Sequence, residues 1–228
     1  MRMHHWAGRV LAVVGVLAAM SATSAVANPV DDEVGVGMGA FFQVNGERKV
    51  GDNDATFTYP GARLTARGQE WGEGYADLGW ESVDLKHYDV NGALAYGVGG
   101  TLWCWKWRNA TAPVSLGLAG DCHMSEHAMA PSGGGGQTDV RHTSMDVQAV
   151  VKARFGSLSP YVRVGCMESR LDPDQDGFFG NADTRSTVPA IQGGFEYEFD
   201  DQVDRFTIDV EASYFSAPGA AIRFAYWF

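Results

Sequence analysis

The chain ends in Ala220-Ala221-Ile222-Arg223-Phe224-Ala225-Tyr226-Trp227-Phe228, a stretch in which two kinds of side chain alternate. The even-numbered residues are apolar, and the odd-numbered ones are small or polar apart from Trp227. Successive side chains of a β-strand point to opposite faces of its sheet. The stretch therefore predicts a strand with one apolar face and with Arg223 on the other face.

The same alternation recurs along the chain in five further segments of five to eleven residues, and transmembrane strands of a barrel have about ten. These are residues 34–43, 145–155, 162–166, 191–199 and 206–214. No segment after the N-terminal region approaches the roughly 18 apolar residues that a membrane-spanning helix needs. Strands that are apolar on one face and polar on the other are typical of a transmembrane β-barrel, in which closure leaves no unpaired edge. The predicted fold class is all-β, a closed antiparallel transmembrane barrel.

Four more segments decide the number of strands. Residues 73–84 and 92–107 are predicted strands, and the second ends in Trp103-x-Trp105-x-Trp107, which suits an interfacial aromatic girdle. Residues 62–68 and 114–121 are accepted or rejected together, because an odd count would leave two neighbouring strands parallel. The barrel has ten strands if both segments are strands and eight if neither is. Ten is favoured, since Arg108–Pro113 suits a short turn before the second of them.

The connections predict how the barrel is oriented. Residues 156–158 and 200–204 form short connections, whereas residues 171–186 form a long polar loop. Barrels of this class keep short turns on the periplasmic side and longer loops outside the cell. With both ends of the chain on the periplasmic side, the short connections fall on that side as well.

The first 27 residues are predicted to be a secretory signal peptide. Arg2 and Arg9 precede a short apolar run, and a small-residue A-x-A site predicts cleavage after Ala27. Residues 28–228 then form one barrel domain in a bacterial outer membrane. They carry 15 Lys and Arg (17 minus 2) against 28 Asp and Glu, a net charge of −13, which argues against nucleic-acid binding.

Charged side chains on the non-lipid faces are predicted to fill and balance the lumen, because buried charges need partners. A barrel of this size is filled by side chains rather than open. The predicted lumen residues are Arg63, Arg67, Asp77, Glu81, Asp146, Lys152, Arg154, Arg163, Glu196, Glu198, Asp209, Glu211 and Arg223.

Several short motifs resemble the opacity and outer-membrane-protein-A type of small bacterial barrel. They are Gly74-Tyr75-Ala76-Asp77-Leu78-Gly79, the segments 158–165 and 193–197, and the C-terminal Phe228. The end of the chain, with Phe224, Tyr226 and Phe228, also resembles the strand that such barrels present to the barrel-assembly machinery. The resemblance implies surface structure, adhesion or membrane anchoring, and it carries over no catalytic residue. Members mostly have eight strands, so ten would be a departure.

Residues 172–183 follow the D-x-D-x-D-G pattern of a calcium-binding loop, with a carboxylate at position 12. The candidate oxygen ligands are the side chains of Asp172, Asp174, Asp176 and Asp183 and the carbonyl of Phe178. Position 12 is Asp rather than Glu, Pro173 stiffens the entry, and no helices flank the loop. The rival interpretation is a solvated acidic loop of turn-forming residues.

Two patterns hint at other chemistry. His123-Met124-Ser125-Glu126-His127 spells the H-x-x-E-H of a zinc peptidase. It is not expected to lie on a helix, and we interpret it as part of an outer loop, where Cys122 and the histidines could bind a soft metal adventitiously. Cys104 and Cys122 could pair in the eight-strand topology, but ten strands place them too far apart. Cys166 is expected to be a lone thiol.

Enzyme chemistry is not expected. His142 and Ser144 could suggest a lipid A hydrolase, but no carboxylate is evidently placed to orient the histidine. The acidic pairs Asp31-Asp32 and Asp200-Asp201 lie far from the outer rim, where an omptin-like protease would need them.

The sequence therefore predicts a non-enzymatic barrel that contacts lipid and, through its loops, an extracellular ligand. It predicts no cofactor apart from the candidate calcium ion. A small cation-preferring channel and a lipid A hydrolase are the alternatives.

Overall fold

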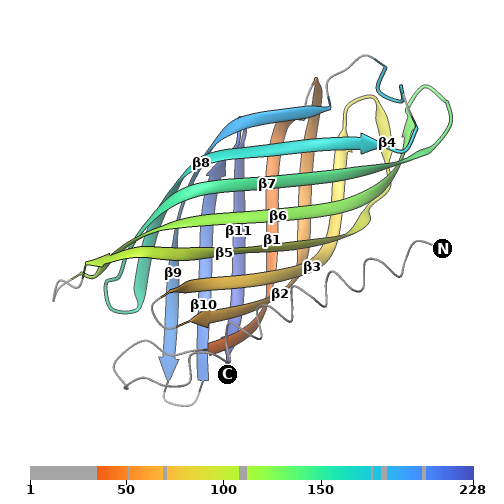
Figure 1. The fold of residues 1–228 in the computed structure, drawn as a ribbon. Coiled ribbons are helices and arrows are strands. Elements are labelled where there is room, and N and C mark those ends of the chain that lie inside the picture. Colours follow the sequence, from red (N-terminus) through yellow and green to blue (C-terminus); the bar gives the residue numbers. More distant parts are fainter. Residues whose placement is uncertain are drawn as a thin grey trace.

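The protein folds into a single closed β-barrel (Figure 1), described by a computed structural model over residues 35–50, 52–68, 71–107, 112–175, 177–180, 184–201 and 204–228. The predicted signal peptide, residues 1–27, lies outside this part of the chain. Within the described ranges, no helix is long and apolar enough to cross a membrane. The strands are β1 (Gly35–Val50), β2 (Asn53–Gly68), β3 (Gly72–Leu85), β4 (Tyr88–Val90), β5 (Ala93–Trp107), β6 (Val114–Pro131), β7 (Thr138–Ala153), β8 (Leu158–Pro173), β9 (Arg185–Asp201), β10 (Asp204–Tyr214) and β11 (Pro218–Trp227).

Ten long strands form the ring, and each pairs antiparallel with its neighbours. The ring closes between β1 and β11, from Gly37 opposite Trp227 to Asn45 opposite Gly219. The short strand β4 pairs with the last residue of β3 and with β6 at one rim. The prediction of ten strands is thus confirmed, and both segments on which it depended belong to longer strands, β2 and β6.

The two ends of the barrel differ in their connections. The end that carries the described chain termini, Gly35 and Phe228, is called the inner end below. The opposite end carries β4 and the β6–β7 and β8–β9 connections, and is called the outer end. In the orientation expected from the sequence, the outer end faces the exterior of the cell.

The outward faces of the strands form an apolar band, as alternation requires of a barrel in lipid. Leu94 is 60% exposed and Val147 is 62% exposed, whereas Asp77 and Glu81 on inward positions of β3 are 8% and 2% exposed. At the inner end, a β-bulge between Trp103 and Trp105 shifts the alternation of β5. As a result Trp105 and Trp107 point outward and Trp103 is half-buried, so the predicted girdle of three tryptophans is wrong for Trp103.

Several strands run farther toward the outer end than expected. Strand β6 continues ten residues past Asp121 to Pro131, and β8 continues to Pro173, into the predicted 171–186 loop. Strands of 16 or 18 residues exceed the roughly 9–11 residues that cross a membrane. Their outer portions carry exposed charged residues such as Glu126, Arg141 and Arg170 on the outward face, and thus extend beyond the apolar band. The outer portions of β6 to β9 are called the outer extension below.

Buried apolar side chains pack together inside the outer end of the barrel. They belong to β1, β2, β3, β6, β7 and β8 and to the β8–β9 connection, and each is at most 7% exposed. This group is called the apolar cap below; it consists of Val50, Ala55, Phe57, Val83, Leu85, Met129, Val140, Leu171 and Phe179, with Tyr88, Val90 and Phe178 packed against it.

Candidate functional site

The inner half of the lumen is filled by pairs of opposite charge. Arg63 Nε and Nη2 donate to the two carboxylate oxygens of Asp77 at 2.7 and 2.6 Å. Arg223 lies 2.7 Å from Asp209 and 3.1 Å from Glu211. The Tyr161 hydroxyl lies 2.8 Å from a carboxylate oxygen of each of these two acids. Bidentate guanidinium–carboxylate contacts fix geometry as well as charge, so this region is rigidly paired.

A second group of pairs lies among the remaining predicted lumen residues. Glu196 accepts from both Arg67 at 3.2 Å and Lys152 at 3.3 Å. Arg154 pairs with Glu198 at 3.4 Å, but its side chain is 55% exposed, so it lies near solvent rather than in the lumen.

Two predicted lumen residues form no ion pair of this kind within the described part of the chain. Asp146 is 8% exposed and accepts a hydrogen bond from Gln148 at 3.2 Å. It stands opposite Asp121 in the β6–β7 register. Arg163 lies with its guanidinium 5.0 Å from the Tyr161 ring centre, and its Nε is buried without a hydrogen-bond partner.

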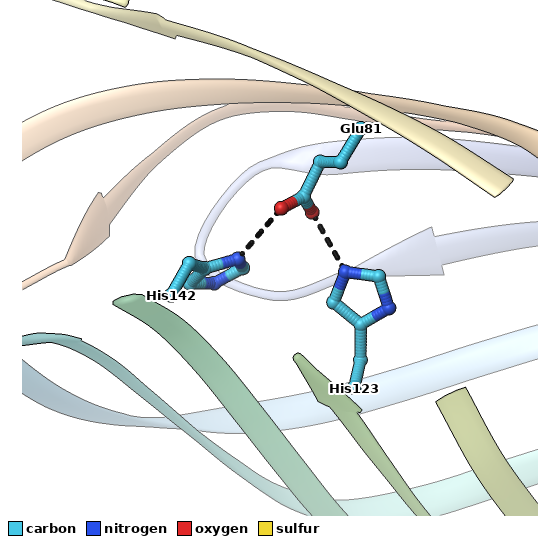
Figure 2. A group of neighbouring side chains, drawn as sticks. All are labelled: Glu81, His123 and His142. Atoms are coloured by element: carbon cyan, nitrogen blue, oxygen red, sulfur yellow. Dashed lines mark hydrogen bonds and ion pairs between the residues drawn. The ribbon is translucent and has the colours of Figure 1, made fainter. Parts of the chain in front are cut away.

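Glu81 belongs to a different group, in which histidines replace arginines (Figure 2). His123 Nε2 lies 2.9 Å from Glu81 Oε1, and His142 Nδ1 lies 3.1 Å from Oε2. His127 Nε2 lies 3.0 Å from the same Oε2. Ser125 Oγ also hydrogen-bonds to Glu81 and lies 2.9 Å from His127 Nε2. We call Glu81, His123, Ser125, His127 and His142 the histidine cluster.

The strand between them explains how these side chains meet. Strand β5 separates β3 from β6, and at this level its inward residues are Ala93 and Ala95, both buried. Because alanines leave space in the lumen, Glu81 of β3 reaches across them to β6. Ser125 of β6 then stands opposite His142 of β7 in the register. The cluster therefore joins β3, β6 and β7 around the small side chains of β5.

The assignment of residues 123–127 to an outer loop is wrong, because these residues lie in the middle of the outer half of β6. Strand alternation turns His123, Ser125 and His127 inward and leaves Glu126 exposed, 3.9 Å from Arg141. The H-x-x-E-H pattern thus separates its glutamate from its histidines. The carboxylate that meets them comes from β3.

The expectation that no carboxylate orients His142 is also wrong. His142 Nδ1 faces Glu81, and its Nε2 lies 3.0 Å from Ser169 Oγ of β8. The order serine, histidine, carboxylate is that of a hydrolase triad. However, Ser169 is 1% exposed and His142 is 0% exposed. The serine oxygen has no open face for a substrate.

The histidine cluster lies between the apolar cap and a polar cavity. The Phe57 ring of the cap stacks on His142 with ring centres 4.5 Å apart. On the other side a cavity of about 70 Å³, room for a few water molecules, is lined by Glu81, His123 and His142. Gln192 also lines it, and the buried Oε1 of Gln192 has no hydrogen-bond partner.

The candidate calcium loop is described only in part. Asp176 and Asp183 lie outside the described residues. Asp172 accepts from Arg170 Nε at 2.6 Å, and the amide of Asp174 donates to the carbonyl of Asp139 at 2.8 Å. Phe178 packs on the apolar cap. Calcium binding in this loop stays a prediction.

The three cysteines are free. Cys122 stands opposite Val98 in the β5–β6 register, and Cys104 lies six residues farther along β5. At about 3.3 Å per residue this is far beyond the reach of a disulfide, as ten strands predict. Cys166 is exposed on the outward face of β8.

The aromatic residues at the chain end lie on the outward face at the inner rim. The Tyr226 ring contacts the rings of Phe206 and Phe228 at 5.1 and 5.0 Å between centres. Phe224 is 47% exposed and Phe228 is 74% exposed. This surface is available to lipid or to an assembly factor.

Comparisons with known proteins give only distant likenesses to solved barrels. No family model and no curated protein matches the chain. The attachment invasion locus protein Ail of Yersinia pestis, crystallised with a heparin analogue, aligns with a TM-score of 0.42 at 13% identity over 87% of this chain and 100% of that one. The translocator domain of the autotransporter NalP from Neisseria meningitidis gives 0.43 at 8% identity, covering 98% and 97%. The transport unit of the Escherichia coli autotransporter AIDA-I gives 0.43 at 9%, covering 93% and 96%.

The fold is a closed antiparallel β-barrel of ten long strands with the apolar outward band that a barrel in lipid requires. Likenesses at this identity concern architecture and carry no information on ligand or activity. What this barrel does must therefore be argued from its own residues.

Proposed function

We propose that this barrel neither conducts nor catalyses, and that it acts through the surface it presents outside the cell. The observation that carries the proposal is the apolar cap. Phe57, Leu85 and Met129 are at most 1% exposed and belong to one buried cluster with Val140 and Leu171 near the outer rim. An ion crossing there would lose its hydration shell without gaining a polar partner, which is strongly unfavourable.

The inner half of the lumen supports the same proposal. Its charged groups are committed to one another in the Arg63–Asp77 and Arg223–Asp209 pairs. A conducting pore needs polar groups that face water along a continuous path. The closed cap argues against the rival function, a cation-preferring channel.

The outer extension is the surface we assign to the interaction. Its outward residues form ion pairs, with Arg185 of β9 at 2.8 Å from Glu168 of β8 and Arg170 at 2.6 Å from Asp172 within β8. Exposed pairs of this kind contribute little to stability. They do give a surface of mixed charge that can recognise a polar partner such as an extracellular ligand or a matrix component. Calcium at residues 172–183 would add to this surface, and calorimetry comparing the wild type with variants at Asp174 and Asp176 tests it.

Planar-bilayer recording tests the absence of conduction. The folded chain, inserted in a lipid bilayer at physiological salt, is expected to give no stable current steps in either direction of voltage. Insertion is verified separately, because lipid-facing Trp80 and Trp105 should be quenched by brominated acyl chains. Stable, ion-selective steps from inserted protein would contradict the proposal and favour the channel.

A further inference from the structure

We propose that Glu81, His123, His127 and His142 bind one divalent transition-metal ion of the zinc type beneath the apolar cap. One ligand atom from each of Glu81, His123 and His142 lies within 4.8 Å of the other two. His127 Nε2 lies 3.0 Å from Glu81 Oε2. Ligands around a tetrahedral zinc ion, each 2.0–2.1 Å from it, are about 3.3 Å apart. The contacts of Glu81 with His123 and His142, at 2.9 and 3.1 Å, are close to that spacing (Figure 2).

The hydrogen atoms of the cluster leave a place for a cation. His127 Nδ1 lies 2.9 Å from the carbonyl oxygen of Asn91, which can only accept, so the ring hydrogen of a neutral His127 sits on Nδ1. Its Nε2 then directs a lone pair toward Glu81 Oε2 and Ser125 Oγ. These three atoms make three close contacts and share the single hydroxyl hydrogen of Ser125. A positive ion between His127 Nε2 and the Glu81 carboxylate removes the repulsion between their lone pairs.

The outer hydrogen bonds of two rings have the form seen around metal-bound histidines. Such histidines usually donate their other N–H to a carbonyl or another acceptor, which fixes the ring and its tautomer. The Asn91 carbonyl does this for His127. Ser169 Oγ, 3.0 Å from His142 Nε2, can do it for His142, because a hydroxyl accepts as readily as it donates.

The electrostatic surroundings also favour a cation. Glu81 is 2% exposed, and in the described part of the chain its ion-pair partners are histidines, since the Arg63 guanidinium is bound by Asp77. The adjoining cavity is lined by four carboxyl side chains, those of Asp77, Glu81, Asp121 and Asp146, against the guanidinium groups of Arg63, Arg163 and Arg223. Arg223 is shared further with Asp209 and Glu211. Acidic walls in a region of low dielectric concentrate cations.

The ligand types select the metal. Three imidazole nitrogens and one carboxylate oxygen suit zinc, copper or nickel, whereas calcium and magnesium prefer oxygen ligands throughout. Four protein ligands fill a tetrahedral zinc ion and leave no open position, the arrangement of structural rather than catalytic sites. The ion would tie β3 to β6 and β7 across the lumen, directly below the cap.

Zinc titration of the folded barrel tests the proposal. The chain is produced without residues 1–27 and without a polyhistidine tag, folded in detergent, and titrated with zinc chloride by calorimetry. We expect one zinc ion per chain and no displacement by millimolar calcium. Ser169→Ala removes only an outer hydrogen bond, so we expect about a ten-fold loss of zinc affinity. His123→Asn and His142→Asn each remove a ligand and should lose more. Cobalt bound in place of zinc should give the visible absorption of a four-coordinate site.

His87 supplies a matched control. It is the one histidine after residue 27 that is outside the cluster, it is exposed, and it has φ of 72° in the β3–β4 turn, a conformation that Asn tolerates well. His87→Asn should therefore bind zinc as the wild type does. Folding of each variant is verified by its gel migration before heating. If His142→Asn does not fold, the zinc affinities of Ser169→Ala and His123→Asn test the proposal instead. The proposal fails if the folded wild type binds no zinc, or if His87→Asn loses as much affinity as the cluster variants.

Discussion

The two halves of the lumen solve the same problem with different side chains. In the inner half, carboxylates such as Asp77 and Glu211 are neutralised by guanidinium groups that carry a permanent charge. In the outer half, Glu81 is surrounded by imidazoles and a hydroxyl group, and the lumen above it is apolar. Asp77 and Glu211 therefore need no further cation, whereas Glu81 can still accept one below the apolar cap.

Removing a guanidinium from the inner half should have the largest effect on stability. Arg223→Met leaves Asp209 and Glu211 without their shared cation, and the Glu211 side chain is 3% exposed. Breaking a buried pair in this way costs about 3–5 kcal/mol. Urea unfolding from lipid vesicles, followed by tryptophan fluorescence, measures the change.

Arg154→Met is the matched control for that substitution. Arg154 makes the same kind of pair with Glu198, but its side chain is 55% exposed. An exposed pair contributes about 0–1 kcal/mol. Equal losses in the two variants would show that the inner lumen is hydrated, and the contrast between the halves would then be wrong.

A smaller change should open the outer half without disturbing the inner half. Phe57→Leu removes the ring that stacks on His142 and part of the buried volume of the cap, for a loss of about 1–2 kcal/mol. Diethyl pyrocarbonate, which modifies accessible imidazoles, should react with His87 in the wild type and also with His142 in the variant. Mass spectrometry of the digested protein locates the modification.

Phe195→Leu makes the same chemical change on the lipid face, where Phe195 is 43% exposed. It should leave His142 as unreactive as in the wild type. If His142 already reacts as fast as His87 in the wild-type barrel, the cap does not exclude water from the cluster.

Much of the inner half could be predicted from the sequence. The alternation that places Ile222 and Phe224 toward lipid and Arg223 inward holds for Asp77 between Ala76 and Leu78, because lipid demands an apolar side chain at every outward position. The same requirement supports the ten-strand count through segments 62–68 and 114–121. Where the outward face contacts lipid, the sequence of a single strand is enough to identify which of its residues point inward.

The outer half could not be predicted in this way. Beyond Asp121, the outward residues of β6 are Cys122, Met124 and Glu126, which are not uniformly apolar because the strand there reaches the edge of the lipid and passes it. Backbone hydrogen bonds to the neighbouring strands stabilise this part of β6. Such bonds leave no alternation of apolar and polar residues in the sequence. The contact between Glu81 and His127 depends further on the register of β3, β5 and β6 and on the small size of Ala93 and Ala95. The histidines were recognised as candidate ligands, but their carboxylate came from another strand.

The smallest effect is expected at the serine that completes a hydrolase-like chain with His142 and Glu81. Ser169 has the hydrogen bonds of a nucleophile, yet its 1% exposure leaves no room for a substrate carbonyl or for oxyanion donors beside it. A fluorophosphonate probe should therefore not label the folded wild type, and overexpression of the wild type or Ser169→Ala should give the same lipid A mass profile. Labelling that Ser169→Ala abolishes would mean that the cap opens and that the cluster is catalytic. In that case the difference between the two halves of the lumen would be one of activity as well as of charge.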